Sequence, residues 1–158
     1  MDFRNKIIPS DIDRLAAIAE STGFFYDSEI DIVKELVTVN FEKGEKQSGY
    51  IFNIATFQDT PVAFTCYGHI PGTADSYDLY WIVVHRDFQG KGIGRVMMDM
   101  AVRDIAQRGG KQIWIETSSR TIYEPTRKFY EKYGCKTIAI LPDYYNVNDD
   151  KFIYSFSV

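Results

Sequence analysis

Apolar residues recur at every third or fourth position in two stretches near the N-terminus, and this period predicts amphipathic helices. The first helix is expected to start near Ser10, a candidate N-cap, and Asp13 completes a capping-box-like pattern. The second helix is expected over about 28–41, and Gly44 follows its end. A short β-rich segment at 3–8 precedes both, so the chain is predicted to begin with one strand and two helices.

Three segments in the middle of the chain are predicted to be strands. Residues 50–57 and 62–69 are rich in β-branched and aromatic side chains and flank a short polar turn, which predicts a hairpin. Residues 77–84 are nearly all apolar or aromatic from Leu79 onward. Such a run is typical of a strand that is buried on both faces.

The C-terminal half alternates between helices and strands. The expected elements are helix 92–107, strand 112–117, helix 125–133, and strands 136–141 and 151–158, with a loop at 142–150. The resulting order β-α-α-β-β-β-α-β-α-β-β combines hairpins with strand–helix–strand crossovers. We therefore predict an α/β fold, a mixed sheet flanked by helices, in one domain that spans residues 1–158.

Charge and hydropathy narrow the choice of partners. The formal net charge is −4, which weighs against nucleic acid or an anionic membrane because both attract positive surfaces. A cationic substrate such as an amine is compatible with it. No apolar run approaches the roughly 18 residues of a membrane span, and no secretory signal follows Met1. We expect a cytoplasmic protein that contacts neither nucleic acid nor membrane.

The residues that commonly bind metals are scattered. Cys66 and Cys135 are the only cysteines, and they do not have Cys-x-x-Cys spacing. They are predicted to be reduced core residues, and one long-range disulfide between them is the alternative. His69 and His85 have no partners at metal-ligand spacing. No metal is expected.

A glycine-rich turn joins the strand 77–84 to the helix that follows it. Its residues are Gln89, Gly90, Lys91, Gly92, Ile93 and Gly94. Glycines let the backbone turn tightly and approach a ligand, and the N–H groups of a helix's first turn attract an anion such as pyrophosphate. Lys91 and Arg95 add positive charge. The spacing fits neither a P-loop nor the Gly-x-Gly-x-x-Gly dinucleotide fingerprint.

Two motifs carry a family resemblance. Gln89-x-x-Gly92-x-Gly94 resembles the Gln/Arg-x-x-Gly-x-Gly/Ala signature of the GNAT N-acetyltransferases, and the segment from Phe129-Tyr130 to Gly134 is similar to that family's Phe-Tyr-x-x-x-Gly-Phe segment. The resemblance implies a mixed sheet that is splayed beside the strand 77–84. It also implies acetyl-CoA as a co-substrate and transfer of its acetyl group to an amine.

The resemblance also assigns cofactor contacts and a general acid. The turn from Gln89 to Arg95 would hold the pyrophosphate, and a backbone N–H at Val83 or Val84 would polarise the thioester carbonyl. Tyr130 matches the family's general acid, which protonates the leaving thiolate. The alternative is that Tyr130 is only a core ring. The family often has Asn seven residues before this Tyr, whereas this chain has Tyr123.

Candidates for the acceptor side of the reaction lie on the strands. Glu116 resembles the base of ribosomal-protein alanine acetyltransferases, and Asp78 has the spacing of the base in histone-type enzymes. Either could instead be an ordinary solvated or salt-bridged carboxylate. Tyr144 and Tyr145 stand where similar enzymes border the acceptor, or they cap a packed loop, and Asp143 beside them is a further carboxylate that could draw a cation.

The acceptor and the assembly are left open by the sequence. The acceptor amine could belong to a small molecule, a protein N-terminus or a lysine, and the protein could be a monomer or a homodimer. A non-catalytic acyl-CoA-binding sensor or interaction module is the alternative from another class, and a purely structural domain is a third. Release of CoA thiol in the presence of an amine distinguishes the enzyme from the other two.

Overall fold

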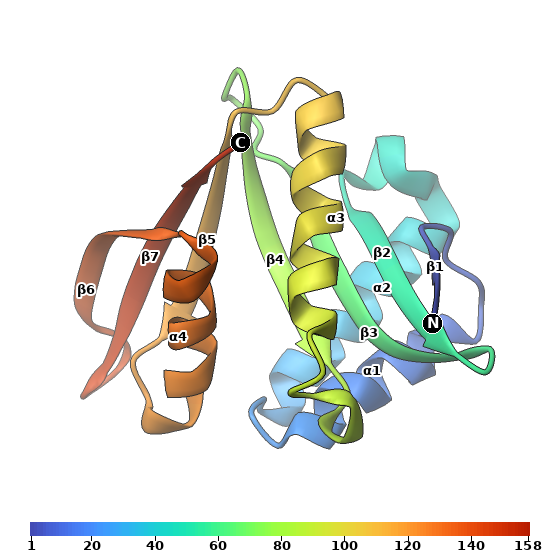
Figure 1. Cartoon of the computed structure of the whole chain (residues 1–158), viewed down its shortest axis with the longest axis horizontal. Coiled ribbons are helices and arrows are strands. Elements are labelled where there is room, and N and C mark those ends of the chain that lie inside the picture. The colour runs from blue at the N-terminus through green and yellow to red at the C-terminus, as the bar shows by residue number, and fades with distance from the viewer. The chain divides into compact units, whose positions relative to one another are not determined.

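The structure, a computed structural model, describes all residues 1–158. The elements in order are β1 (Asp2–Arg4), α1 (Asp11–Thr22), α2 (Asp27–Ser48), β2 (Ile51–Phe57), β3 (Thr60–His69), β4 (Ser76–Val84), the 3₁₀ turn η1 (Arg86–Phe88), α3 (Ile93–Gln107), β5 (Gln112–Ser118), η2 (Thr121–Tyr123), α4 (Glu124–Tyr133), β6 (Lys136–Asn146) and β7 (Asp149–Ser157). The predicted order of strands and helices is confirmed (Figure 1).

The seven strands form one mixed sheet in the order β1-β2-β3-β4-β5-β7-β6. Strand β4 pairs with β5 in parallel, with Ser76 opposite Gln112 and Asp78 opposite Trp114. The β1–β2, β2–β3, β5–β7 and β6–β7 pairs are antiparallel. The predicted α/β class and mixed sheet are therefore confirmed.

The chain folds into two compact units. The first holds residues 1–68 and 81–104, and the second holds residues 69–80 and 105–158. Strand β4 and helix α3 each contribute residues to both units. The single domain over 1–158 stays a prediction. No helix is both long and apolar enough to cross a membrane.

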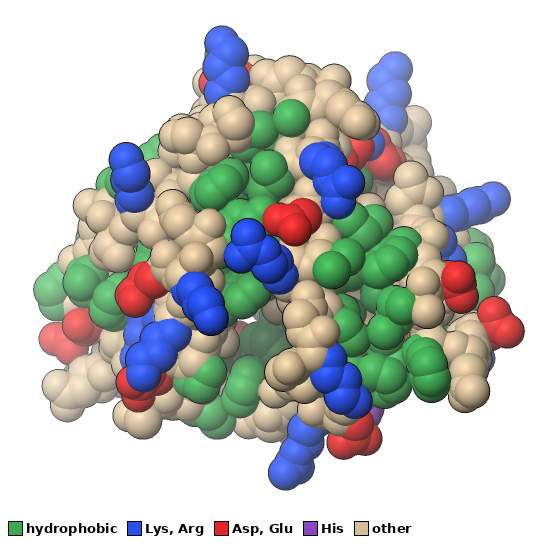
Figure 2. Space-filling view, in the orientation of Figure 1, with side chains coloured by type: hydrophobic (Ala, Val, Ile, Leu, Met, Phe, Trp, Pro, Cys, Tyr) green, Lys and Arg blue, Asp and Glu red, His purple; other side chains and the backbone are tan.

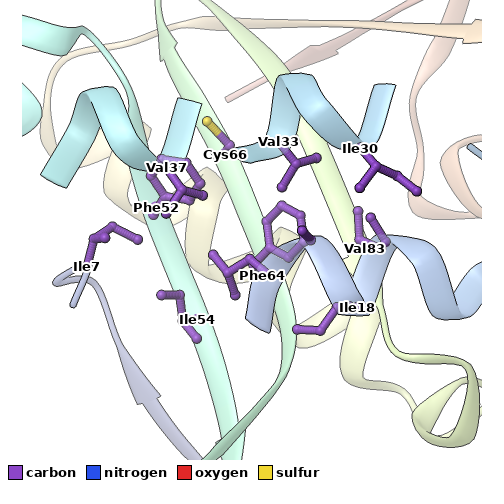
Figure 3. Packing of buried hydrophobic residues seen from close by; sticks show 13 residues of the cluster. Ile7, Ile18, Ile30, Val33, Val37, Phe52, Ile54, Phe64, Cys66 and Val83 are labelled. Carbon is purple, nitrogen blue, oxygen red and sulfur yellow. The ribbon is translucent and has the colours of Figure 1, made fainter. Parts of the chain in front are cut away.

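The core of the first unit lies on both faces of its strands. Helices α1 and α2 cover one face, and α3 lies on the other (Figure 1). On the α1/α2 face, Phe64 of β3 and Val83 of β4 point toward Ile18 and Val33 of the helices (Figure 3). Such fully buried apolar side chains each stabilise the fold by about 1.5–3 kcal/mol. On the α3 face the core cluster contains Ala55, Val62, Ala63, Ile93 and Met97.

The core of the second unit is built from aromatic rings. Helix α4 lies over the sheet formed by β5, β7 and β6 (Figure 1). Its Tyr130 ring lies 5.7 Å from that of Tyr154 on β7, and its Tyr133 ring lies 5.2 Å from that of Phe156. Gly134 ends the helix with φ 109°, a backbone angle that favours glycine. This confirms the predicted glycine stop.

The start of α1 differs from the predicted capping box. Ser10 has a helical backbone conformation and makes no side-chain cap. The fully buried Asp11 instead holds the start of the helix in place. Its carboxylate accepts hydrogen bonds from the Ile8 N–H at 2.8 Å and from the two terminal nitrogens of Arg4 at 2.6 and 2.8 Å. Asp13 is exposed and makes no cap; its carboxylate forms only a long ion pair with the Lys34 ammonium, at 3.9 Å.

Replacing Ser10 with Ala is therefore expected to change the free energy of unfolding by less than about 0.5 kcal/mol, rather than the usual capping loss of about 1 kcal/mol. Asp11→Asn removes the charge that faces Arg4 and is expected to cost about 2 kcal/mol. Urea unfolding of both variants measures the difference. A loss at Ser10 as large as that at Asp11 would contradict the observed cap.

Helix α2 is longer than predicted. It continues through Gly44, where φ 75° and ψ 170° produce a kink, and ends at Ser48. Gly49 then adopts φ 74° and donates its N–H to the Glu45 carbonyl at 2.9 Å. The helix therefore bends at the first glycine and ends at the second.

Two strand predictions also need correction. Strand β4 is not buried throughout, because Tyr80 is 39% exposed and Asp78 is partly exposed. The expected loop 142–150 is mostly strand, since β6 extends to Asn146 and β7 starts at Asp149. Strand β6 is one of the two edge strands of the sheet and exposes apolar side chains that include Ile138 and Ile140. Its register with β7 shifts between Thr137 and Ala139, which leaves Ile138 as a bulge.

Both cysteines are buried free thiols, so the disulfide alternative does not hold. Cys66 lies in the core of the first unit and Cys135 in the second unit. Burial raises the pKa of both thiols, for Cys135 to about 11. They are therefore protonated and unreactive at neutral pH.

Candidate functional site

The glycine-rich turn lies in the first unit, between the end of β4 and the start of α3. Gly90 and Gly92 have φ 72° and 81°, and no protein atom lies within 4 Å of where a Cβ would stand at either position. The backbone angle therefore requires glycine here, and the space beside it is open. Gly94 lies in the first turn of α3 and has no positive φ.

The first turn of α3 can bind an anion. Val96 donates its N–H to the Gly92 carbonyl at 3.2 Å, and the N–H groups that come before such a bond have no intrahelical acceptor. They act together with the helix dipole, which favours negative charge at this end. Lys91 and Arg95 are exposed on the same turn. A pyrophosphate fits both the charge and the donors.

Side-chain contacts fix this turn to the end of β4 and to η1. Gln89 Nε2 donates to the Val84 carbonyl at 3.1 Å, and Lys91 Nζ donates to the Asp87 carbonyl at 2.9 Å. The Lys91 ammonium also lies 5.1 Å from the centre of the Phe88 ring. The structure thus brings the predicted cofactor residues from Val83 to Arg95 together in one unit.

The predicted acceptor residues come together on the sheet of the second unit, around a residue that the sequence did not single out. Lys151 Nζ lies 2.7 Å from Glu116 Oε2 and 4.2 Å from the centre of the Tyr144 ring. The rings of Tyr144 and Tyr145 pack edge to face at 5.1 Å. We call Asp78, Glu116, Tyr144, Tyr145 and Lys151 the strand cluster.

Electrostatic coupling connects Asp78 to this cluster. Burial is the main cause that raises the pKa of Asp78, the Glu116 carboxylate raises it further, and Lys151 opposes both. Burial alone would lower the pKa of Lys151, but contacts with Glu116 and Tyr144 outweigh it and raise that pKa. The cluster therefore holds one firmly protonated ammonium and a carboxyl group with increased proton affinity.

Tyr130 belongs to the same unit but faces the other side of the sheet. Its ring packs on Tyr154, which pairs with Ile115, and neighbouring residues of a strand point to opposite faces. Glu116 therefore faces away from Tyr130. Burial raises the pKa of the Tyr130 phenol well above its ordinary value. The phenol is protonated at neutral pH, as a general acid must be, although its proton is released less easily than that of a free tyrosine.

Two further predicted positions have structural partners. Tyr123, at the position where the family often has Asn, is buried, and the centre of its ring lies 5.2 Å from the Arg120 guanidinium carbon. Asp143 shapes the β6–β7 hairpin, since its carboxylate accepts the Asn148 N–H at 2.7 Å and its own N–H donates to Asp150 at 2.9 Å. Asp143 thus holds the end of the β6–β7 hairpin together and is not a member of the strand cluster.

A family model and a solved structure that resemble this chain point to the same protein family. The Acetyltransferase (GNAT) family model matches residues 15–135. A solved structure from Desulfovibrio desulfuricans, assigned to the GNAT acetyltransferases, is 39% identical with a TM-score of 0.96 and covers 99% of this chain and 98% of its own. No curated protein matches the sequence at a significant level.

More distant structures share the fold. An aminoglycoside 6'-N-acetyltransferase complexed with coenzyme A is 20% identical with a TM-score of 0.76, and covers 99% of this chain and 97% of its own. The ribosomal-protein-S18-alanine N-acetyltransferase from Escherichia coli is 19% identical with a TM-score of 0.75, and covers 99% and 94%. The family match spans most of the chain, and the strand–turn–helix that it covers has the expected geometry, so the chain belongs to the GNAT acetyltransferase family.

Proposed function

We propose that the protein transfers an acetyl group from acetyl-CoA directly to a primary amine. The observation that carries this proposal is the turn at Gly90 and Gly92, which opens α3 with space beside its backbone. A phosphate group can approach such a backbone closely and accept its N–H groups. Coenzyme A carries a pyrophosphate, and the turn from Gln89 to Arg95 is proposed to bind it.

The proposed reaction follows from the protons that the amine must lose and the leaving thiolate must gain. An ammonium with a pKa near 10 cannot attack until a base removes one proton. The freed nitrogen lone pair then forms a bond to the thioester carbonyl carbon, whose oxygen is polarised by a backbone N–H at Val83 or Val84. The carbon–sulfur bond breaks, and Tyr130 donates a proton to the departing thiolate, which is proposed to leave on the sheet face opposite the strand cluster. A carboxylate of the strand cluster is the proposed base, and no metal takes part.

The acceptor is proposed to arrive as a cation. Glu116 is half exposed, and the rings of Tyr144 and Tyr145 are exposed beside it, which suits an ammonium group because carboxylates and aromatic faces both attract cations. Acidic and basic side chains are interspersed over the face in Figure 2, unlike the positive surface that nucleic acid attracts. The amine could belong to a small molecule or to a protein N-terminus or lysine, and a cytoplasmic location stays a prediction.

The test is a screen for CoA thiol release from acetyl-CoA in the presence of different amines. A suitable set is spermidine, kanamycin, an alanine-starting peptide and a peptide with an internal lysine. We expect one class to release thiol well above the rate without amine, with one acetyl-CoA bound per chain by calorimetry. Binding without release for every amine would favour the sensor alternative. Absence of acetyl-CoA binding would overturn the proposal.

A further inference from the structure

Lys151 is an unusual residue for its position. Its side chain is only 10% exposed, yet it carries a full positive charge on a sheet face, near the start of β7. Its ammonium contacts the Glu116 carboxylate at 2.7 Å and the Tyr144 ring at 4.2 Å. Buried charges are found where they are paired, because an unpaired one would lose its hydration without compensation. The ammonium therefore fixes two residues that the proposed function places at the acceptor.

The strand register places three charges on one sheet face. Asp78 stands opposite Trp114, and Glu116 is two residues further along the same strand. Lys151 stands opposite Ser118, two residues beyond Glu116. Side chains at alternate positions share a face, so the face carries Asp78, Glu116 and Lys151 on three adjacent strands. Among them, Glu116 is tied to the ammonium and Asp78 has no ion pair.

We propose that Lys151 is a positioning residue that holds Glu116 and Tyr144 in place, and that it thereby leaves Asp78 as the carboxylate that takes the acceptor's proton. This inference rests on the proposed function. The proton moves from the acceptor ammonium to a carboxylate oxygen of Asp78, and the amine lone pair becomes free to attack. Glu116, held by its ion pair with Lys151, orients the incoming ammonium through its half-exposed carboxylate.

Removing Glu116 and removing Lys151 should change the pKa of Asp78 in opposite directions. Glu116 repels a second negative charge and Lys151 attracts it, so loss of Glu116 should lower the pKa of Asp78 and loss of Lys151 should raise it. Other titratable groups lie near these charges, namely Tyr144, Tyr145 and Asp149, and they are the same in every variant. The opposite signs distinguish a coupled charge set from general damage to the fold.

The first experiment measures the Asp78 carboxyl by carbon-13 NMR titration of the protein without substrate. We expect its midpoint to move up in Lys151→Met, down in Glu116→Gln, and back toward the wild-type value in Lys151→Arg. Lys111→Met is the matched control, because it removes an exposed lysine paired with Asp75 at 3.3 Å in the same unit. Equal midpoints in all these proteins would overturn the inference, and this measurement needs no acceptor.

The second experiment follows turnover against pH with the best amine of the screen. A base acts only when deprotonated, so the rate falls as pH drops through its pKa, and a raised pKa moves this limb to higher pH. Lys151→Met should move the limb up and Glu116→Gln should move it down. Asp78→Asn should lower turnover about 10²-fold and remove the limb. If Glu116→Gln removes the limb while Asp78→Asn keeps it, Glu116 is the base. If the wild type acetylates no amine, the proposed function fails instead.

Discussion

Replacing Tyr130 with Phe is expected to lower turnover about 10²-fold or more, which is the usual contribution of a general acid. The affinity for acetyl-CoA should be unchanged. Phe keeps the ring contacts with Phe129 at 5.5 Å and Tyr154 at 5.7 Å, so the core should lose little stability. Thiol release gives the rate, and calorimetry gives the affinity.

Tyr133→Phe is the matched control for this prediction. Tyr133 lies one turn further along α4 and packs on Phe156, so its phenol is not expected to take part in the reaction. Because burial raises the pKa of Tyr130, the acid form persists at high pH, and the wild-type rate should show no loss from its ionisation below about pH 10. Equal turnover rates for the two variants would show that Tyr130 serves only as a core ring.

The second large effect is expected at Gly92. Gly92→Val should weaken acetyl-CoA binding by roughly tenfold to several hundredfold, because a branched side chain would occupy the open space beside the turn and keep a phosphate from its N–H donors. Each lost hydrogen bond to a charged group costs about 1.5–3 kcal/mol, and about 1.4 kcal/mol is a factor of ten in affinity. Calorimetric titration with acetyl-CoA measures the change.

Backbone strain must be separated from this effect. Gly109, at the other end of α3, has φ 83° against 81° for Gly92, and a Cβ added to either glycine would meet no protein atom within 4 Å. Gly109→Val should therefore lose similar stability, about 1–2 kcal/mol for a left-handed residue, while it binds acetyl-CoA normally. If both variants bind equally well, the turn does not carry the pyrophosphate. If both bind equally poorly, strain rather than blocked access explains the loss.

Local patterns predicted most of the elements because their causes are local. The turn after β4 needs glycines for its positive φ angles, and these glycines stand in sequence where the turn forms. Helix α4 likewise ends at Gly134 as expected. The order of elements along the chain and the mixed sheet followed from the hairpin and the crossovers, which are properties of neighbouring segments.

The errors arose where a distant residue decides the outcome. The cap of α1 depends on Arg4, whose guanidinium reaches Asp11 from another element. Polar residues around Asp143 suggested a loop, but β6 continues to Asn146, which pairs with Asp149 of β7. Lys151 was missed because it follows two aspartates at the start of a strand, where a charged residue usually faces solvent. Only the fold shows that Glu116 lies beside it.

The outer strand β6 has a consequence for how concentrated solutions of the protein behave. Exposed backbone and apolar side chains such as Ile140 at a sheet edge invite another chain to add a strand. The bulge at Ile138 interrupts the regular spacing of donors and acceptors, and Pro142 has no N–H to offer. An incoming strand could therefore match only a short stretch of this edge. These two irregularities protect the protein against fibril-like aggregation, without a charged residue at every position.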